Sequence, residues 1–289
     1  MKIIDRSLYA DFRVVTSPIR VCPDFIIVGE AKCGTTSAYH YIGQHPDVFS
    51  AIKKEPRNFI EYPNSIAQCR RHYPTIIRKA LHRGIGGSRF VAGEATAEYF
   101  ANRHVPGVLS RLLPKVKIIV MLRHPSARAL SDYQMFKNQK LVDESFEVIV
   151  DRSIRWLSND DVYPWLLDAG QYEHSTIRFV LRGIYFEPAQ RWIKHFAKEQ
   201  MLFVCSEDFF SETGETAERI FRFLGLDDHR VEKLDVQRKG CYEWGAHKQA
   251  LGKLDNFYSA HNEKLYALLG QDYGWHDAKK AAAAVYRDE

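Results

Sequence analysis

Residues 26–41, IIVGEAKCGTTSAYHY, combine an apolar run, a glycine-bounded turn and the start of a helical pattern. Backbone N–H groups in such a turn converge on a bound anion, and the helix N-terminus contributes partial positive charge. Lys32 would add a mobile charge, and Thr35 and Thr36 would add hydroxyl donors. The stretch therefore predicts a phosphate-binding loop.

The position of the lysine distinguishes this loop from the Walker A motif. In GxxxxGK[ST] the lysine follows the second glycine, whereas here Thr35 occupies that place and Lys32 precedes Gly34. The downstream strand pattern VMLRHP ends in Arg and His and offers no single Asp for magnesium. The loop is thus expected to rely on protein cations, with no metal required. A P-loop kinase or nucleotide hydrolase is the disfavoured alternative.

A second strand, turn and helix pattern reads KIIVMLRHPSARALSDYQMFK. It places Arg123 at the carboxyl end of a strand and Ser131 in the helix that follows. Ligands of open α/β sheets bind outside the carboxyl ends of the strands, so both segments are expected to face one crevice. Arg123 is suited to a forked contact with a phosphate, and Ser131 to one further hydrogen bond.

Short apolar runs rich in β-branched residues predict buried parallel strands, and most are followed by helical periodicity. These runs are residues 25–29, 90–94, 116–122 and 201–207. The alternation predicts an α/β, P-loop-like three-layer fold, with a central parallel sheet flanked by helices on both faces.

The length of 289 residues fits a single domain, 1–289, with its core at about 24–275. Residues 144–198 read as an aromatic-rich helical region, which we expect on the acceptor side. Residues 227–254 read as a long, partly irregular excursion typical of a lid loop.

A formal charge of +5 and a pI near 8.8 suit an anionic ligand without the dense basic clustering of a nucleic-acid binder. The five cysteines are scattered without CxxC spacing, which favours a reducing compartment. We see neither a signal peptide nor an apolar run of membrane-spanning length. The sequence therefore predicts a cytoplasmic enzyme with no nucleic-acid or membrane partner, and it allows a homodimer.

The two motifs together resemble those of sulfotransferases that use 3′-phosphoadenosine 5′-phosphosulfate (PAPS). GEAKCGTTSAYHYIGQHPDV resembles their 5′-phosphosulfate loop, and IIVMLRHPSARALSDY resembles their 3′-phosphate segment. Further segments stand in the order typical of the heparan sulfate branch, which includes the glucosaminyl 3-O- and N-sulfotransferases. These segments are KKEPRNF, GIYFEPAQRWIKHF, QMLFVCSEDF, FRFLGL, RKG and DYGW. The resemblance covers about residues 24–275.

The resemblance implies transfer of a sulfuryl group from PAPS to a hydroxyl, or less favourably an amine, of a carbohydrate or small-molecule acceptor, with PAP as the product. Lys32 would bind the phosphosulfate and stabilise charge on the bridging oxygen as the bond breaks. The cofactor-binding residues implied by the motifs are Lys32, Cys33, Gly34, Thr35, Thr36, Arg123, Ser131, Arg238, Lys239 and Gly240.

Glu55, in KKEPRNF, matches the catalytic glutamate of the heparan sulfate branch and would act as the general base for the acceptor. Without the resemblance it would be a surface residue in a charged cluster. Because Lys53 and Lys54 favour the ionised form of Glu55 and so would lower its pKa, burial would have to raise the pKa again for Glu55 to be an effective base. His45 and His124 are interpreted as structural.

The clearest departure from the branch is Ala95, which stands where the similar segment has a lysine. Cys241 has no evident partner nearby. Both differences favour a cytoplasmic relative that acts on a smaller molecule. Ala95 also leaves room for a non-catalytic nucleotide-binding protein, although Lys32, Arg123, Ser131 and Glu55 argue against it. Tyr185 and Arg191 could line the acceptor site, with an aromatic helix packed on the sheet as an equal alternative.

Overall fold

The computed structural model describes residues 6–86, 89–159, 175–232 and 244–276. Within these residues five strands form one parallel sheet in the order β2-β3-β1-β4-β5. The strands are β1 (Phe25–Gly29), β2 (Val48–Ser50), β3 (Val91–Thr96), β4 (Lys117–Leu122) and β5 (Met201–Cys205). Because β1 is central and neighbours both β3 and β4, the segments that follow these three strands emerge side by side.

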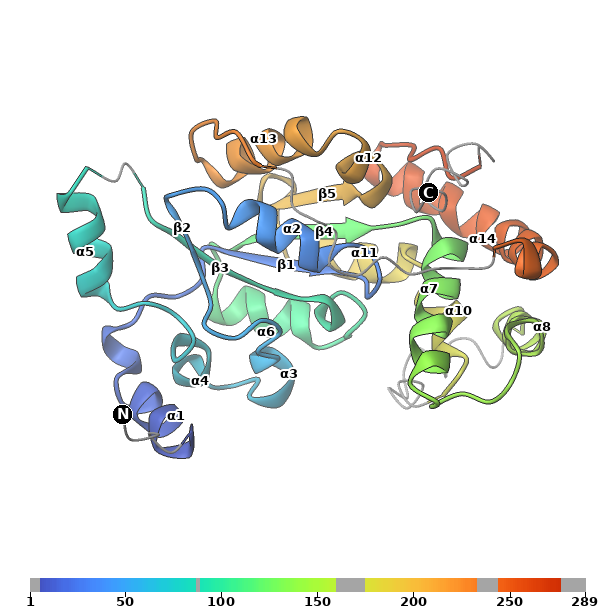
Figure 1. The fold of residues 1–289 in the computed structure, drawn as a ribbon, viewed down its shortest axis with the longest axis horizontal. Coiled ribbons are helices and arrows are strands. Elements are labelled where there is room, and N and C mark those ends of the chain that lie inside the picture. The colour runs from blue at the N-terminus through green and yellow to red at the C-terminus, as the bar shows by residue number, and fades with distance from the viewer. Residues whose placement is uncertain (1–5, 87–88, 160–174, 233–243, 277–289) are drawn as a thin grey trace.

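Helices connect the strands and extend beyond the sheet (Figure 1). The N-terminal half contains α1 (Arg6–Val15), η1 (Ser17–Ile19), α2 (Thr35–Ile42), α3 (Asn58–Glu61), α4 (Ile66–Arg70), α5 (Ile76–Gly84), η2 (Ala97–Tyr99), α6 (Val105–Leu112) and α7 (Pro125–Asn138). The C-terminal half contains α8 (Phe146–Leu157), α10 (Arg178–Leu181), α11 (Phe186–Ile193), η4 (Lys198–Gln200), α12 (Ser206–Ser211), α13 (Thr213–Leu224), η5 (Trp244–His247) and α14 (Lys248–Leu269).

Each face of the sheet buries its own apolar cluster because successive side chains of a strand point to opposite faces. Ile26, Val28 and Ile118 pack with residues of α6 and α11 on one face. Ile27 and Met121 pack with residues of α2, α12 and α13 on the other. The parallel sheet with helices on both faces confirms the predicted three-layer α/β fold.

A third apolar cluster joins α7, α8, α10 and α14 beside the sheet, and these helices lie together on the right of Figure 1. The predicted helical region 144–198 contains α8, α10 and α11. In the predicted lid region 227–254 the residues from Lys248 onward belong to α14, and the lid role stays a prediction. The burial of Leu254 and Tyr258 against the third cluster explains this helix.

The predicted strands correspond to β1, β3, β4 and β5, with end shifts of one or two residues. Strand β2 was not predicted, because its three residues, Val48–Ser50, are too few to show a pattern. No helix in the described part of the chain is both long and apolar enough to cross a membrane.

Candidate active site

The loop after β1 and the segment after β4 meet at the carboxyl edge of the sheet. Arg123 Nη1 lies 3.4 Å from the backbone oxygen of Lys32, to which it donates. Lys32 Nζ lies 3.7 Å from Met135 Sδ on α7, one helical turn beyond Ser131. The structure thus gathers Lys32, Arg123 and the helix that carries Ser131, as the crevice argument predicted.

The backbone of the predicted phosphate loop is shaped for anion capture. Lys32 and Gly34 both have left-handed φ values, 71° and 77°. A Cβ on Gly34 would lie 3.0 Å from the ring of Phe210, so a side chain there would be crowded as well as strained. Helix α2 begins at Thr35, and the first N–H groups of a helix have no intrahelical acceptor. These groups and the helix dipole suit an anion.

Cys33 and Tyr185 hold the loop from inside the protein. Cys33 is fully buried, and burial raises the pKa of its thiol to about 12. The hydroxyl of Tyr185 donates to the backbone oxygen of Arg123 at 2.8 Å and lies 3.8 Å from Cys33 Sγ. Ser206 Oγ donates to the backbone oxygen of Cys33 at 2.6 Å. Cys33 can therefore serve a ligand only through its backbone, and the burial of Tyr185 fits the packing alternative.

A buried ion pair that the sequence did not reveal anchors the start of the loop. Glu30 Oε1 accepts from the backbone N–H of Ala31 at 2.7 Å and lies 2.5 Å from Arg182 Nη2. Both side chains are about 1% exposed. On neighbouring α7, buried Arg128 pairs with Asp132 at 3.2 Å. These pairs tie the loop to the helices beside the sheet.

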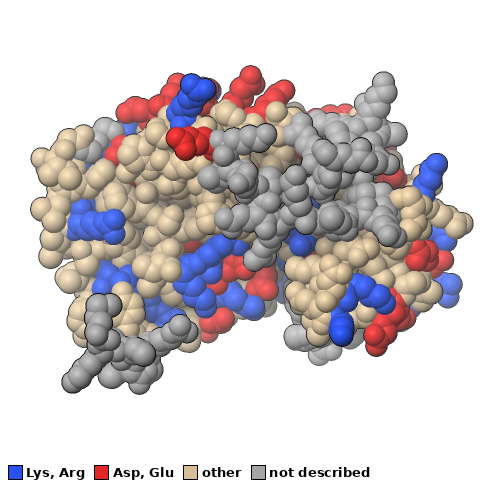
Figure 2. Space-filling model, viewed as in Figure 1, with Lys and Arg blue, Asp and Glu red and all other residues tan. Residues whose placement is uncertain are grey.

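The predicted base, Glu55, lies in the loop that follows β2. Its φ is 54°, and its backbone N–H donates to the oxygen of Ala95 at the end of β3. Its side chain is 47% exposed and lies 2.8 Å from Lys54 Nζ. The burial that the sequence argument required is absent, because the loop lies on the surface over the strand end. Figure 2 shows charged side chains gathered near the middle of this face, over α3.

A second carboxyl lies beneath Glu55 and was missed. Glu94 of β3 is fully buried and accepts a 2.6 Å hydrogen bond from Thr96 Oγ1, while its Oε1 has no hydrogen-bond partner within the described part of the chain. Burial raises the pKa of Glu94 to about 8, and the charge of Glu55 adds to this effect. Glu94 is therefore mostly protonated at neutral pH. The sequence did contain a signal for this buried carboxyl, because Glu94 stands inside the otherwise apolar run FVAGEAT.

Arg191, the other predicted acceptor residue, lies on α11. Its Nη1 donates to the backbone oxygen of Ala101, beyond β3, at 3.3 Å. The neighbouring Trp192 is fully buried and donates through its indole N–H to Phe100 at 3.0 Å. Both contacts link α11 to the segment after β3, and an acceptor-binding role for Arg191 stays a prediction.

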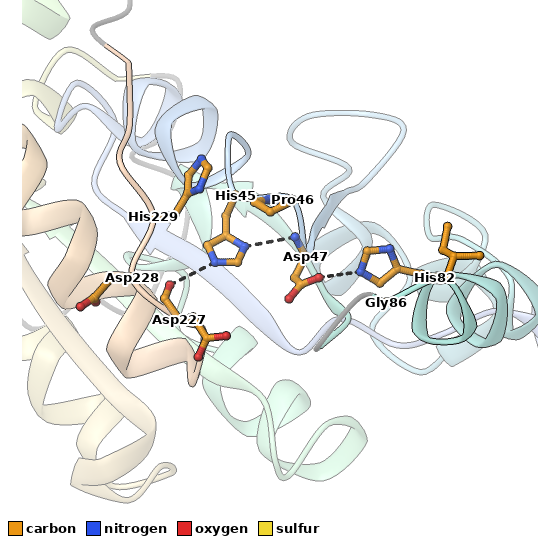
Figure 3. Close-up of a pocket in the computed structure, with 9 residues that line it drawn as sticks. His45, Pro46, Asp47, His82, Gly86, Asp227, Asp228 and His229 are labelled. Carbon is orange, nitrogen blue, oxygen red and sulfur yellow. Dashed lines mark hydrogen bonds and ion pairs between the residues drawn. The ribbon is translucent and has the colours of Figure 1, made fainter.

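His45 lies just before the amino end of β2, and Figure 3 shows it between Asp47 and Asp227. Its Nδ1 accepts from the N–H of Asp47 just before β2, and its Nε2 lies 3.1 Å from the oxygen of Asp227. Burial lowers the pKa of its ring. With His82 and His229, these residues line a pocket of about 410 Å³ away from the phosphate loop. The contacts agree with a structural role for His45.

The structural interpretation of His124 also fits. The ring of His124 is buried, and its Nε2 lies 3.0 Å from the backbone oxygen of Trp275. The backbone N–H of His124 donates to Glu207. The predicted second cofactor segment, Arg238, Lys239 and Gly240, lies outside the described residues, as does Cys241. The described residues contain no group of three His, Cys, Asp or Glu side chains placed to hold a metal ion.

Comparison with known proteins decides the family. A family model for the sulfotransferase domain matches residues 22–242, most of the chain. The chain belongs to the sulfotransferase domain family.

Relatives within the family include two groups of carbohydrate enzymes. The mouse heparan sulfate glucosamine 3-O-sulfotransferase 3B1 is 28% identical over 277 residues, which cover 88% of this chain and 65% of the relative. The rat carbohydrate sulfotransferase 15 is 26% identical over 312 residues, covering 89% and 55%. The chain thus spans less than two thirds of each of these proteins. The resemblance to the heparan sulfate branch is confirmed.

A solved structure confirms the fold. A sulfotransferase from Alicyclobacillus acidocaldarius superposes with a TM-score of 0.66 at 23% identity, over 89% of this chain and all of that one. The likeness extends over nearly the whole described chain, so the sheet and its flanking helices are those of a sulfotransferase.

Proposed function

We propose that this chain transfers a sulfuryl group from PAPS to a hydroxyl, or less favourably an amine, of a carbohydrate or small-molecule acceptor, and releases PAP. The observation that carries the proposal is the convergence of Lys32, Arg123 and α7 at the carboxyl edge of the sheet. Lys32 and the start of α2 fit the 5′ end of the donor, and Arg123 and Ser131 fit its 3′-phosphate.

The chemical step requires charge stabilisation and removal of one proton. The acceptor oxygen forms a bond to sulfur while the bond between sulfur and the bridging oxygen of PAPS breaks. The electron pair leaves with PAP, where Lys32 neutralises the developing charge. The proton of the acceptor passes to Glu55, whose exposed carboxylate is accessible to an acceptor at the surface.

Glu94 supports Glu55 from below. As a protonated carboxyl it adds no second negative charge beside the base, whereas an ionised Glu94 would repel the carboxylate of Glu55. The backbone hydrogen bond from Glu55 to Ala95 links the base to the strand that carries Glu94.

Transfer of labelled sulfuryl groups tests the proposal. The protein, incubated with labelled PAPS and a panel of sugars, phenols and amines in the presence of a metal chelator, is expected to form a labelled product. Glu55→Gln should keep the affinity for PAP and lower turnover by about 10²-fold or more. Glu61→Gln is the matched control, because Glu61 is similarly exposed and paired with a cation, Arg57.

Normal turnover of Glu55→Gln would contradict the assignment of the base, whereas absence of transfer to every acceptor despite tight binding of PAP would favour a non-catalytic nucleotide-binding protein. A P-loop kinase or nucleotide hydrolase remains the other alternative. A cytoplasmic location and a homodimer stay predictions.

A further inference from the structure

Helix α5 turns its apolar face to solvent. The exposed fractions of Ile76, Ile77, Leu81 and Ile85, which immediately follows the helix, are 51%, 60%, 63% and 83%, and no residue of α5 is buried. A surface helix ordinarily directs its apolar stripe to the core. The reversed orientation calls for an apolar environment outside the chain.

Contacts of the polar face fix this orientation. His82 Nε2 lies 2.6 Å from Asp47 Oδ1, and the His82 ring packs edge-on against Phe49 at 4.9 Å. The guanidinium of Arg78 lies 5.2 Å from the centre of the Phe49 ring. The helix is therefore held to the protein by its cationic and polar side, which leaves the isoleucines and Leu81 outward.

Helix α1 shows the same reversal at the same end of the molecule (Figure 1). Arg13 is buried and donates to the backbone oxygen of Tyr73 at 3.0 Å. Phe12 and Val15 are 58% and 77% exposed. Both helices direct polar or cationic side chains toward the protein and apolar side chains toward solvent. The same reversal in two helices is harder to attribute to chance than a reversal in one.

An antiparallel bridge joins the residue after η1 to the residue before α5. Arg20 pairs with Thr75, which places Ile19 opposite Ile76. We call the combined feature the α1–α5 apolar surface. Its members are Tyr9, Phe12, Val15, Ile19, Ile76, Ile77, Leu81 and Ile85. They are eight of the fourteen exposed large apolar residues in the described chain, so the exposure is concentrated and not scattered.

The α5 side of this surface is strongly basic, whereas α1 carries one exposed acidic residue, Asp11. No acidic residue occurs between Glu61 and Glu94, whereas six cations do. They are Arg70, Arg71, Arg78, Lys79, Arg83 and Arg89. Figure 2 shows mainly tan and blue atoms at the end of the molecule where α5 lies. The occupant must therefore be anionic as well as apolar.

We propose that the α1–α5 apolar surface docks this chain onto an anionic lipid membrane. A bilayer supplies both an acyl boundary for the exposed isoleucines and anionic headgroups for the exposed cations Arg83 and Arg89. A symmetric second copy would bring the same basic residues toward one another. A nucleic acid would use the cations but would leave the apolar side chains without a partner. This docking departs from the sequence-based prediction of no membrane partner.

Flotation of the full-length chain with lipid vesicles tests the proposal. The protein is expected to float with vesicles that contain phosphatidylglycerol, and not with vesicles of phosphatidylcholine alone. Binding should weaken as salt is raised, because the headgroup attraction is screened. Arg83→Gln should weaken binding by about fivefold, and the double variant Ile77→Gln, Leu81→Gln should abolish it.

Leu141→Gln combined with Val148→Gln is the matched control, because both residues are more than half exposed but lie outside the surface. This control should float like the wild type. If the Ile77 and Leu81 variant does not fold, Ile85→Gln, at the most exposed position, replaces it, with unfolding temperature as the check of the fold.

Three results would overturn the proposal. The wild type could fail to float with anionic vesicles, or the double variant could float as well as the wild type. Alternatively, light scattering could show a dimer that the double variant dissociates and that vesicles do not compete for, in which case the occupant is a second copy. None of these measurements depends on sulfuryl transfer, so they stand apart from the proposed function.

Discussion

Replacing Glu94 by glutamine should flatten the pH dependence of stability. In the folded protein burial raises the pKa of Glu94 to about 8 from an ordinary value of 4.5. The folded state therefore binds the proton more tightly than the unfolded state, and the native protein loses stability as pH rises from about 4.5 to 8. Glutamine keeps the shape of the protonated carboxyl but cannot ionise.

The size of the effect follows from the two pKa values. Linkage with 1.36 kcal/mol per pKa unit gives a loss of about 4 kcal/mol from this group between pH 5 and pH 9. We expect the variant to have the larger free energy of unfolding when both proteins are unfolded with urea at several pH values. The difference should grow with pH and reach about 4 kcal/mol at pH 9. At pH 5 the two proteins should be nearly equally stable.

The difference between the two curves isolates Glu94 because all other ionisable groups are shared. Glu98→Gln, a more exposed carboxyl paired with Arg57, is the matched control and should show no comparable growth with pH. Parallel stability curves for wild type and Glu94→Gln from pH 5 to pH 9 would refute the buried, protonated state of this group.

The remaining predictions concern the phosphate loop. Lys32→Ala should lower the rate of sulfuryl transfer by about 10³-fold because it removes a cation at the leaving group. Lys137→Ala, at an exposed position of α7, is the control. Equal losses in the two variants would contradict the role of Lys32 at the leaving group. Arg123→Ala should weaken PAP binding by about 10-fold to 100-fold and leave the binding of adenosine 5′-phosphate nearly unchanged, both measured by calorimetry. Equal weakening for the two nucleotides would show that Arg123 does not contact the 3′-phosphate. Glu30→Gln should lower the free energy of unfolding by about 3–5 kcal/mol because it removes the negative charge that faces buried Arg182. A change below about 1 kcal/mol in urea unfolding would contradict this.

The elements proposed to hold the donor were predictable because their signals are local. A strand, a glycine turn and a helix are each encoded within a few residues, so residues 25–42 and 117–138 folded as expected. Family resemblance then assigned roles to Lys32 and Arg123, which the sheet order brings together. Their roles in binding stay predictions until a donor complex is measured.

Features that depend on distant partners were not predictable. Glu30 and Arg182 are far apart in the sequence, and nothing local to either reveals a buried pair. The exposure of Glu55 follows from where its loop rests on β3. The reversed α5 has an ordinary amphipathic pattern, and its outward face is revealed by contacts with distant residues, such as His82 with Asp47 and Arg78 with Phe49.

Calorimetric titration with PAP tests the central claim most directly. We propose that this site binds a 3′-phosphorylated adenine nucleotide with protein cations and without a metal. We expect micromolar binding of PAP in the presence of a chelator and much weaker binding of ATP with Mg²⁺. Preference for ATP with Mg²⁺, or loss of PAP binding on chelation, would contradict it.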